Sequence, residues 1–247
     1  MRRGRLIVGT LGVVLVVAAF AWACTDLHAF GHGVTRYGEM VARATVPERA
    51  ATNAVGAVTF DFRGFDTLGE EFILFIAVIG VSILLRTLRS EASQEEEHVE
   101  EPGPRGSGFA RWLGAGLVGP VAVLAAYIVT HGALTPGGGF QGGAILMAAV
   151  TAIFVGGEYA VLLTVRSSAT WLDIADALGA AGLVIIGFGG LIAAGTFFQN
   201  FIDKGTSGLL TGGIIPLANI TVGLEVAGAL LMVAAELLDQ RLLSTRT

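Results

Sequence analysis

The sequence has little charge, one lysine and one cysteine. Only 14% of its 247 residues are charged and 53% are hydrophobic, whereas an ordinary soluble domain is about 25% charged. Cys24 alone excludes an intramolecular disulfide and a cysteine metal cluster, and the single lysine, Lys204, lies outside the long apolar stretches. These shortages argue against a soluble domain and predict an all-α integral membrane protein.

Motifs for nucleotide, metal or covalent chemistry are also missing. The sequence contains neither a G-x-x-x-x-G-K-[ST] phosphate loop nor an HExxH zinc motif. His28 and His32 are four residues apart, as in a metal pair, but no third ligand is near them, so we interpret them as interfacial histidines. We expect no catalytic residue, no metal, no cofactor and no nucleic-acid partner.

Apolar segments dominate what is present. About six of them suit the crossing of a hydrocarbon core about 30 Å thick, and they arrange as two spans followed by four. A basic start and the Ala21-Trp22-Ala23 sequence leave a cleaved signal peptide as the alternative for the first segment. The expected spans are residues 6–23, 72–85, 112–130, 140–165, 177–198 and 214–238.

An acidic stretch separates the two groups of spans. Residues 90–108 include two glutamate clusters and Pro102-Gly103-Pro104, and such a run repels itself and has no apolar face. We therefore predict a two-helix module at 1–89, a solvated linker at 90–108 and a four-helix domain at 109–247. Lys and Arg are more frequent on the side of the N-terminus, which places both termini and the linker in the cytoplasm.

The region before the second span has the composition of a membrane surface. Residues 35–57 alternate charged and small apolar side chains, which predicts an interfacial helix interrupted near Pro47. Asp66 or Thr67 can cap the helix that follows. Glu70 and Glu71 would then lie in its first turn, where the helix dipole favours negative charge.

The stretch from His131 to Gly143 reads His-Gly-Ala-Leu-Thr-Pro-Gly-Gly-Gly-Phe-Gln-Gly-Gly. Proline breaks a helix, and glycines let the backbone approach a partner closely. Irregular backbone survives in a membrane only where protein or water satisfies it. We expect a packed loop that contacts partner proteins through Pro136, Gly137, Gly138, Gly139, Phe140, Gly142 and Gly143.

A few ionisable side chains lie within the apolar segments, namely Glu158, Glu225 and Glu236. A carboxylate at the bilayer centre costs a few kcal/mol, so it must be protonated, paired or hydrated. Glu225 and Glu236 are eleven residues apart, which returns to nearly one helix face about 16 Å further along. His131 suits proton handling or the capping of helical carbonyls. Two interpretations stay open: a proton or cation route, or side chains that bond to neighbouring helices and snorkel to the surface.

The pattern at residues 131–143 resembles the MnhB/MrpB family, small membrane subunits of the Mrp-type multisubunit Na⁺/H⁺ antiporter. The four-span layout from about Arg111 matches that family as well. Residues 53–86, with Asp61-Phe62-Arg63-Gly64-Phe65-Asp66-Thr67-Leu68-Gly69-Glu70, resemble the C-terminal end of the large MrpA subunit. Related segments occur in membrane-bound hydrogenases with Mrp-like modules.

The resemblance implies a plasma-membrane transporter subunit, not an enzyme, in a complex that exchanges cytoplasmic Na⁺ for external H⁺. Its partners would be the large A- and D-like subunits, the small C-, E-, F- and G-like subunits, and the lipid bilayer. Here the MrpA-like tail stands without the large antiporter body, and no lysine lies within a span. We therefore expect the chain not to pump alone. Candidates for lining an ion route are Glu225, Glu70, Asp66, Glu158 and His131.

Two other functions remain open at this stage. The chain is alternatively a membrane-arm subunit of a related hydrogenase or respiratory complex that uses the same module. A structural membrane protein without a transport role is the third possibility.

Overall fold

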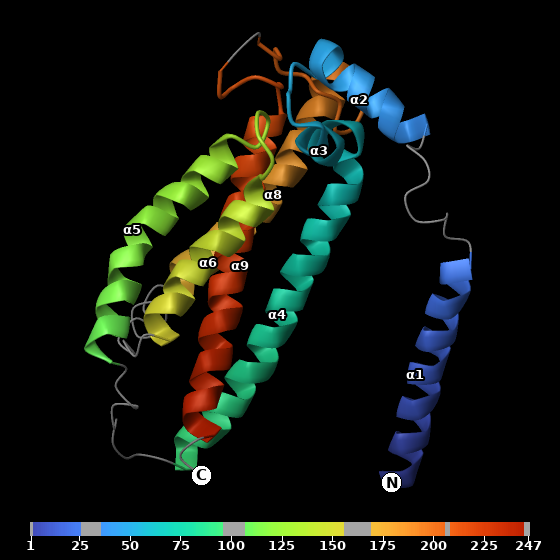
Figure 1. The fold of residues 1–247 in the computed structure, drawn as a ribbon. Coiled ribbons are helices and arrows are strands. Elements are labelled where there is room, and N and C mark those ends of the chain that lie inside the picture. The colour runs from blue at the N-terminus through green and yellow to red at the C-terminus, as the bar shows by residue number, and fades with distance from the viewer. Residues whose placement is uncertain (1, 26–35, 96–106, 156–168, 206–207, 245–247) are drawn as a thin grey trace. The chain divides into compact units, whose positions relative to one another are not determined.

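The computed structural model describes residues 2–25, 36–95, 107–155, 169–205 and 208–244. Within these ranges the regular structure is helical and contains no strand (Figure 1). The chain forms two separate units, Met1–Met40 and Val41–Thr247. All contacts discussed below lie inside the second unit.

The helices are few and long. The structure contains α1 (Arg2–Thr25), α2 (Arg36–Arg49), α3 (Ala54–Ala57), a π-helical turn η1 (Val58–Phe62), α4 (Gly64–Glu95), α5 (Gly108–Thr130), α6 (Gly139–Val155), α8 (Ala169–Ala194) and α9 (Ile215–Ser244).

Five of these helices are long and apolar enough to cross a membrane. Their apolar spans are Ile7–Thr25, Gly64–Leu85, Arg111–Thr130, Thr170–Ala194 and Ile215–Leu237, and α6 contributes the shorter apolar helix Gly139–Phe154. The all-α membrane architecture is thereby confirmed, with the count of six spans standing as approximate. The rest of the expected fourth span, including Glu158, lies outside the described residues, as do His28 and His32.

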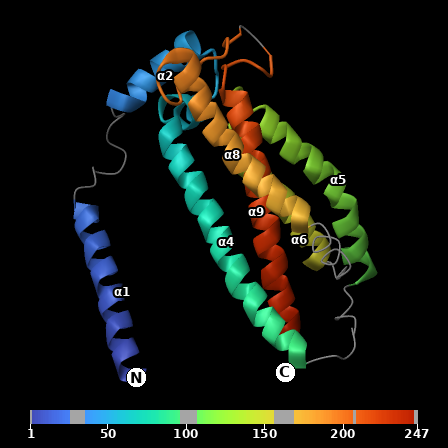
Figure 2. The same cartoon turned by 180° about the vertical axis from the view of Figure 1, so that it is seen from behind.

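Helix α9 is the centre of the second unit. It packs against α4, α6 and α8, while α5 packs mainly against α6, and the view from behind shows the same neighbours around it (Figure 2). A larger share of its span is buried than of any other described span. The fully buried side chains include Ile214, Ile215, Val222 and Val226 in and just before α9 and Leu183 of α8.

Glycines explain how the helices come so close to α9. A Cβ on Gly179 of α8 would lie 2.5 Å from the Cβ of Glu225, and one on Gly143 of α6 would lie 2.8 Å from the amide nitrogen of Ala227. Without a driving force from water, helices associate in lipid through such small residues and close packing. Helices α6 and α8 are therefore fixed against α9 at the level of Glu225.

Several helix boundaries differ from the sequence prediction. Helix α4 begins at Gly64, so Asp66 and Thr67 lie in its first turn and not at its cap. The reason is local pairing: Asp66 pairs with Arg63, and Thr67 Oγ1 donates a hydrogen bond to the Thr59 carbonyl at 2.6 Å. Glu70 and Glu71 consequently lie one turn further along the helix than expected.

Two other ends also move outward. Helix α4 continues to Glu95, into the first residues of the predicted linker. Helix α8 begins at Ala169, so Asp173 and Asp176 lie within it. The apolar side chains of Trp171 and Ile174 extend its apolar surface toward the N-terminus. The predicted surface helix corresponds to α2, which contains Pro47 and ends two residues later.

Candidate functional site

The glycine-rich loop between α5 and α6 is held by α9. Asn219, which is fully buried, accepts a hydrogen bond from the Gly139 N–H at Oδ1 (2.9 Å) and donates to the Ile215 carbonyl from Nδ2 (2.9 Å). A Cβ on Gly138 would lie 2.5 Å from Asn219 Oδ1, and its φ of +148° is one that other residues rarely adopt. The loop therefore requires glycine at this position.

The same loop is held from the other side by the segment before α3. The N–H groups of Thr52 and Asn53 both donate to the Ala133 carbonyl at 3.1 Å. The Asn53 side chain donates from Nδ2 to the carbonyls of Gly132 (2.8 Å) and Thr135 (2.9 Å). The N-terminal module thus pairs with the loop of the C-terminal domain. The loop has partners within its own chain, and its contact with other proteins stays a prediction.

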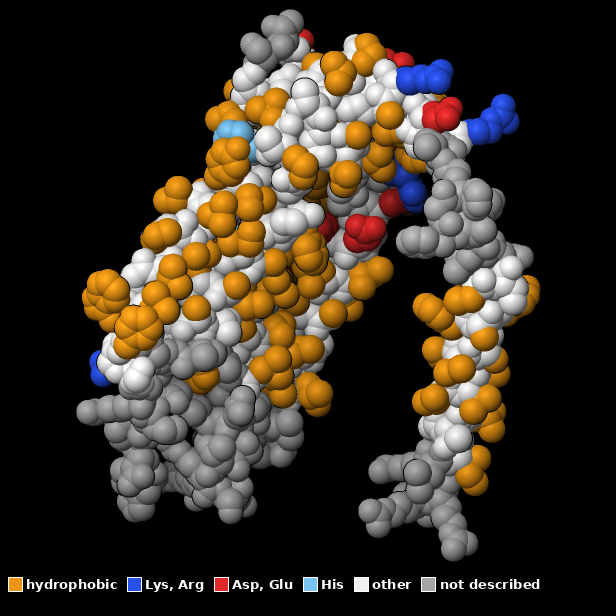
Figure 3. All heavy atoms as spheres, in the orientation of Figure 1, with side chains coloured by type: hydrophobic (Ala, Val, Ile, Leu, Met, Phe, Trp, Pro, Cys, Tyr) orange, Lys and Arg blue, Asp and Glu red, His pale blue; other side chains and the backbone are white. Residues whose placement is uncertain are grey.

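A pocket of about 320 Å³ opens beside this loop, and we call it the vestibule. Its wall combines the glycine-rich loop with the first turns of α4, including exposed Glu70 and buried Glu71. Figure 3 shows acidic side chains gathered in a recess above the apolar surface of the helices. The full lining is Val55, Gly56, Thr59, Phe60, Thr67, Glu70, Glu71, Gly137, Gly138, Gly139, Phe140, Gln141 and Val222.

Three buried carboxylates lie where α4, α8 and α9 meet, and we call them the carboxylate triad: Glu71, Asp176 and Glu225. Their exposed fractions are 4%, 2% and 0%. Glu225 interacts electrostatically with the other two. Glu71 Oε2, Asp176 Oδ1 and both carboxylate oxygens of Glu225 have no hydrogen-bond partner.

Unpaired carboxylates in apolar surroundings are costly unless a proton, a cation or water compensates them. The described residues include no group of three or more His, Cys, Asp or Glu side chains arranged to hold a metal ion. The triad is therefore suited to exchange of protons or loosely held monovalent cations. The alternative in which Glu225 hydrogen-bonds to a neighbouring helix does not match the structure.

Below the triad, the contact between α4 and α9 becomes apolar. Val78 of α4 packs with Ala229 and Met232 of α9 in a buried cluster. Glu236 of α9 and Ser82 of α4 are buried further along. Within the described residues, the polar groups of the triad are thus separated from Glu236 by an apolar layer.

The other predicted route residues lie apart from the triad. Asp66 is exposed and paired with Arg63. The Nδ1 atom of His131 lies 2.9 Å from the Tyr127 carbonyl, and its ring stacks on the Tyr127 ring at 3.9 Å between centroids. This geometry matches the capping alternative for His131. Glu70 lines the vestibule, and Glu158 lies outside the described residues.

Sequence reasoning missed Glu71 and Asp176 as members of the site. A usable signal existed for Glu71, because Thr67, Glu71, Val78 and Ser82 are all buried and their spacing is that of one helix face. Asp176 carries no comparable signal, since its position follows from the close contact of α8 with α9 at Gly179.

Comparison with known families covers both parts of the chain. Residues 109–232 match a family described as a domain related to the MnhB subunit of Na⁺/H⁺ antiporter. Residues 1–102 match MbhE, a family of MBH subunits. An uncharacterized protein of Methanocaldococcus jannaschii is 30% identical over 240 residues, which is 88% of each chain.

Two solved structures are similar in fold. One is a chain of the membrane-bound sulfane sulfur reductase, an archaeal respiratory membrane complex, with a TM-score of 0.66 and 26% identity over 95% of this chain and 98% of that one. The other is a chain of the Mrp complex from Dietzia sp. DQ12-45-1b, with a TM-score of 0.69 and 20% identity. The match covers 95% of this chain and 26% of the Dietzia chain.

Proposed function

The chain belongs to the family of domains related to the MnhB subunit of Na⁺/H⁺ antiporters, and from this premise we propose that it is an accessory membrane subunit of a multisubunit cation/proton antiporter complex. Its partners are the other Mrp-type subunits, both the large A- and D-like and the small C-, E-, F- and G-like ones. Its contribution is to join two modules of the complex and to line part of the ion route.

The observation that carries this proposal is the carboxylate triad behind the vestibule. Glu70 at the exposed wall attracts cations or protons, and Glu71 connects this wall to the interior. Asp176 and Glu225 receive the charge from Glu71 at the meeting point of three helices. Intramembrane carboxylates with these properties mark ion and proton pathways in transporters.

The apolar layer of Val78, Ala229 and Met232 supports an accessory role. It interrupts the polar groups between the triad and Glu236, so the described part of the chain offers half a route and not a complete one. A partner subunit completes the passage to the other side. With the N-terminus in the cytoplasm, as we predict, the vestibule faces outward.

Purification of the complex from native membranes, followed by identification of its subunits, tests this proposal. We expect large antiporter-type subunits to co-purify with the chain. Reconstituted alone in liposomes, the chain should leave imposed sodium and proton gradients untouched. Robust exchange by the lone chain would contradict the accessory role.

A second candidate function is that of a membrane-arm subunit in a respiratory complex. The match to the reductase chain covers 98% of that chain, whereas the match to the Mrp chain covers 26% of a longer one. The whole-chain organisation is therefore shared with the respiratory example. Co-purification of subunits with redox centres would favour this candidate over the antiporter.

A further inference from the structure

A second pocket, of about 430 Å³, lies where α4 begins and α8 ends, and we call it the interfacial pocket. The span of α4 starts at Gly64 and that of α8 stops at Ala194, so the pocket lies at the level of the lipid headgroups. It shares no lining residue with the vestibule. Its lining is Arg49, Asp61, Phe62, Arg63, Gly64, Phe65, Thr196, Phe197, Phe198, Gln199, Asn200 and Lys204.

One cation of this lining is held in a fixed position. The Nε atom of Arg49 pairs with Asp61 Oδ1 at 3.0 Å, and its guanidinium lies over the Phe62 ring, 4.7 Å from the centroid. Asn200 Nδ2 donates to the other oxygen of Asp61 at 2.7 Å. This network fixes the guanidinium at the wall with only one of its nitrogens used by Asp61.

Two further cations line the pocket. Arg63 pairs with Asp66, a residue outside the lining. Lys204 donates from Nζ to the carbonyl of Glu48 at 2.6 Å, and this neutral acceptor leaves the lysine charge uncancelled. Three cations against the single carboxylate of Asp61 give the lining a positive charge.

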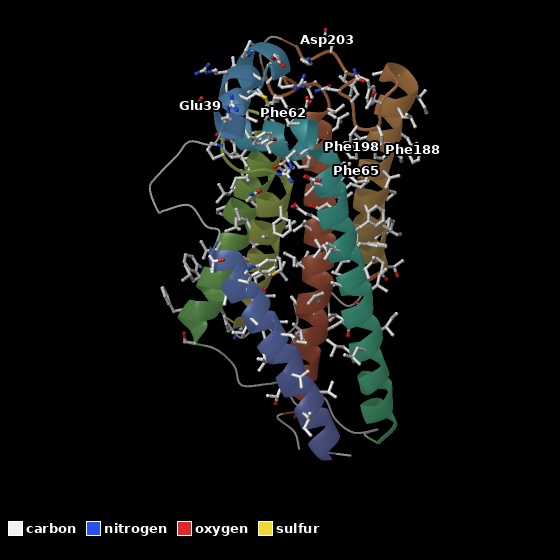
Figure 4. The ribbon with its side chains drawn as sticks, turned by 90° about the vertical axis from the view of Figure 1, so that its right-hand side faces the viewer. Glu39, Phe62, Phe65, Phe188, Phe198 and Asp203 are labelled. Carbon is white, nitrogen blue, oxygen red and sulfur yellow. The ribbon has the colours of Figure 1, made fainter. Side chains whose placement is uncertain are left out.

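Aromatic side chains connect this charged pocket to the lipid-facing surface. Phe198 in the pocket contacts Phe197 edge-on, with centroids 5.2 Å apart. Phe197 contacts Phe65 of α4 at 6.2 Å and Phe188 of α8 at 5.4 Å. Phe65 and Phe188 are both exposed, and Figure 4 shows them with Phe198 near the upper ends of α4 and α8.

The backbone around Phe198 is specialised for this arrangement. Its φ of +63° is uncommon for a residue with a bulky side chain. The conformation is held because the Phe198 N–H donates to the Gly187 carbonyl at 3.1 Å and its ring packs against Gly64. The wall of the pocket is thus built and not incidental.

We propose that the interfacial pocket binds the phosphate of an anionic phospholipid, whose acyl chains follow Phe65 and Phe188 into the membrane. Phosphate oxygens accept the charge-assisted hydrogen bonds that arginine and lysine donate. Basic pockets between membrane helices bind anionic headgroups for this reason. The exposed rings select a lipid over a soluble phosphate, because only a lipid supplies apolar chains to cover them.

The test uses the purified complex in detergent and counts bound phosphatidylglycerol by native mass spectrometry during a titration. The double variant Arg63→Gln, Lys204→Gln should lose roughly tenfold or more in affinity, since each basic residue near a lipid surface contributes about 1 kcal/mol. The matched control is Arg111→Gln, at the start of α5 and outside the pocket, which should bind as the native chain does.

Glycerol phosphate distinguishes a soluble anion from a lipid. Phe65→Ala should weaken phosphatidylglycerol binding and leave the weak binding of glycerol phosphate unchanged. Should the double variant fail to assemble, Lys204→Gln alone gives the same comparison. Unchanged phosphatidylglycerol affinity in these variants would overturn the proposal. Equally tight glycerol phosphate binding, or loss of a partner subunit without loss of lipid, would overturn it too.

Discussion

Asn219 holds the first residue of α6, because its Oδ1 accepts a hydrogen bond from the Gly139 N–H at 2.9 Å. The first N–H groups of a helix have no partner within that helix, and here the buried amide of α9 supplies one. The same side chain contacts the space that a Cβ would occupy at Gly132 and Gly138. One polar residue of α9 therefore fixes both the glycine-rich loop and the start of α6.

Replacing Asn219 by Leu should destabilise the protein by about 1–3 kcal/mol, the cost of leaving a buried N–H without a partner. Thermal unfolding of the variant in detergent measures this loss. Ile220→Ala, at a half-exposed neighbour on the same helix, is the matched control and should change the midpoint little. Equal midpoints for the two variants would show that the Asn219 contact is unimportant.

Replacing Gly138 by Val should prevent assembly of the complex. The position has a φ of +148°, and a Cβ there would lie 2.5 Å from Asn219 Oδ1. Val is among the residues that such a backbone excludes most strongly. Co-purification of partner subunits is the measurement, with Gly80→Val as control because a Cβ at Gly80 meets nothing within 4 Å. Normal recovery of partners with the Gly138 variant would refute the packed loop.

Gly179→Ala tests the close contact between α8 and α9. Alanine usually stabilises a helix relative to glycine by up to about 1 kcal/mol, but a Cβ here would lie 2.5 Å from the Cβ of Glu225. We expect the steric cost of about 1–3 kcal/mol to dominate, so the unfolding midpoint should fall. Gly116→Ala, which has open space, should keep or raise it. A raised midpoint in both variants would show that the helices are not held this closely.

The sequence predicts the class, the helical spans and the importance of the glycine-rich loop, because these depend on local composition. The triad depends instead on how distant helices pack. Glu71 looks like a favourable charge at a helix start, and Asp176 looks like the opening of a helix. Only the contact of α8 with α9 at Gly179, and of α4 with α9, brings these two side chains to Glu225.

The cap positions failed for a similar reason. Asp66 and Thr67 have the composition of N-caps, but Arg63 and Thr59 offer them partners that the π-helical turn places within reach. Such pairing follows from the path of the backbone before α4. The residue types alone do not reveal it.

The central claim, that the carboxylate triad carries ions in the assembled complex, is tested most directly by Glu225→Gln. Glutamine keeps the size of the side chain and removes the carboxylate. The initial rate of Na⁺-dependent proton exchange in membrane vesicles that contain the assembled complex is the measurement, with Asp203→Asn in the connector between α8 and α9 as the carboxylate control. We predict normal assembly for both variants and a rate lower by about tenfold or more for Glu225→Gln alone. A fully assembled Glu225→Gln complex that exchanges sodium for protons at the native rate would contradict the account.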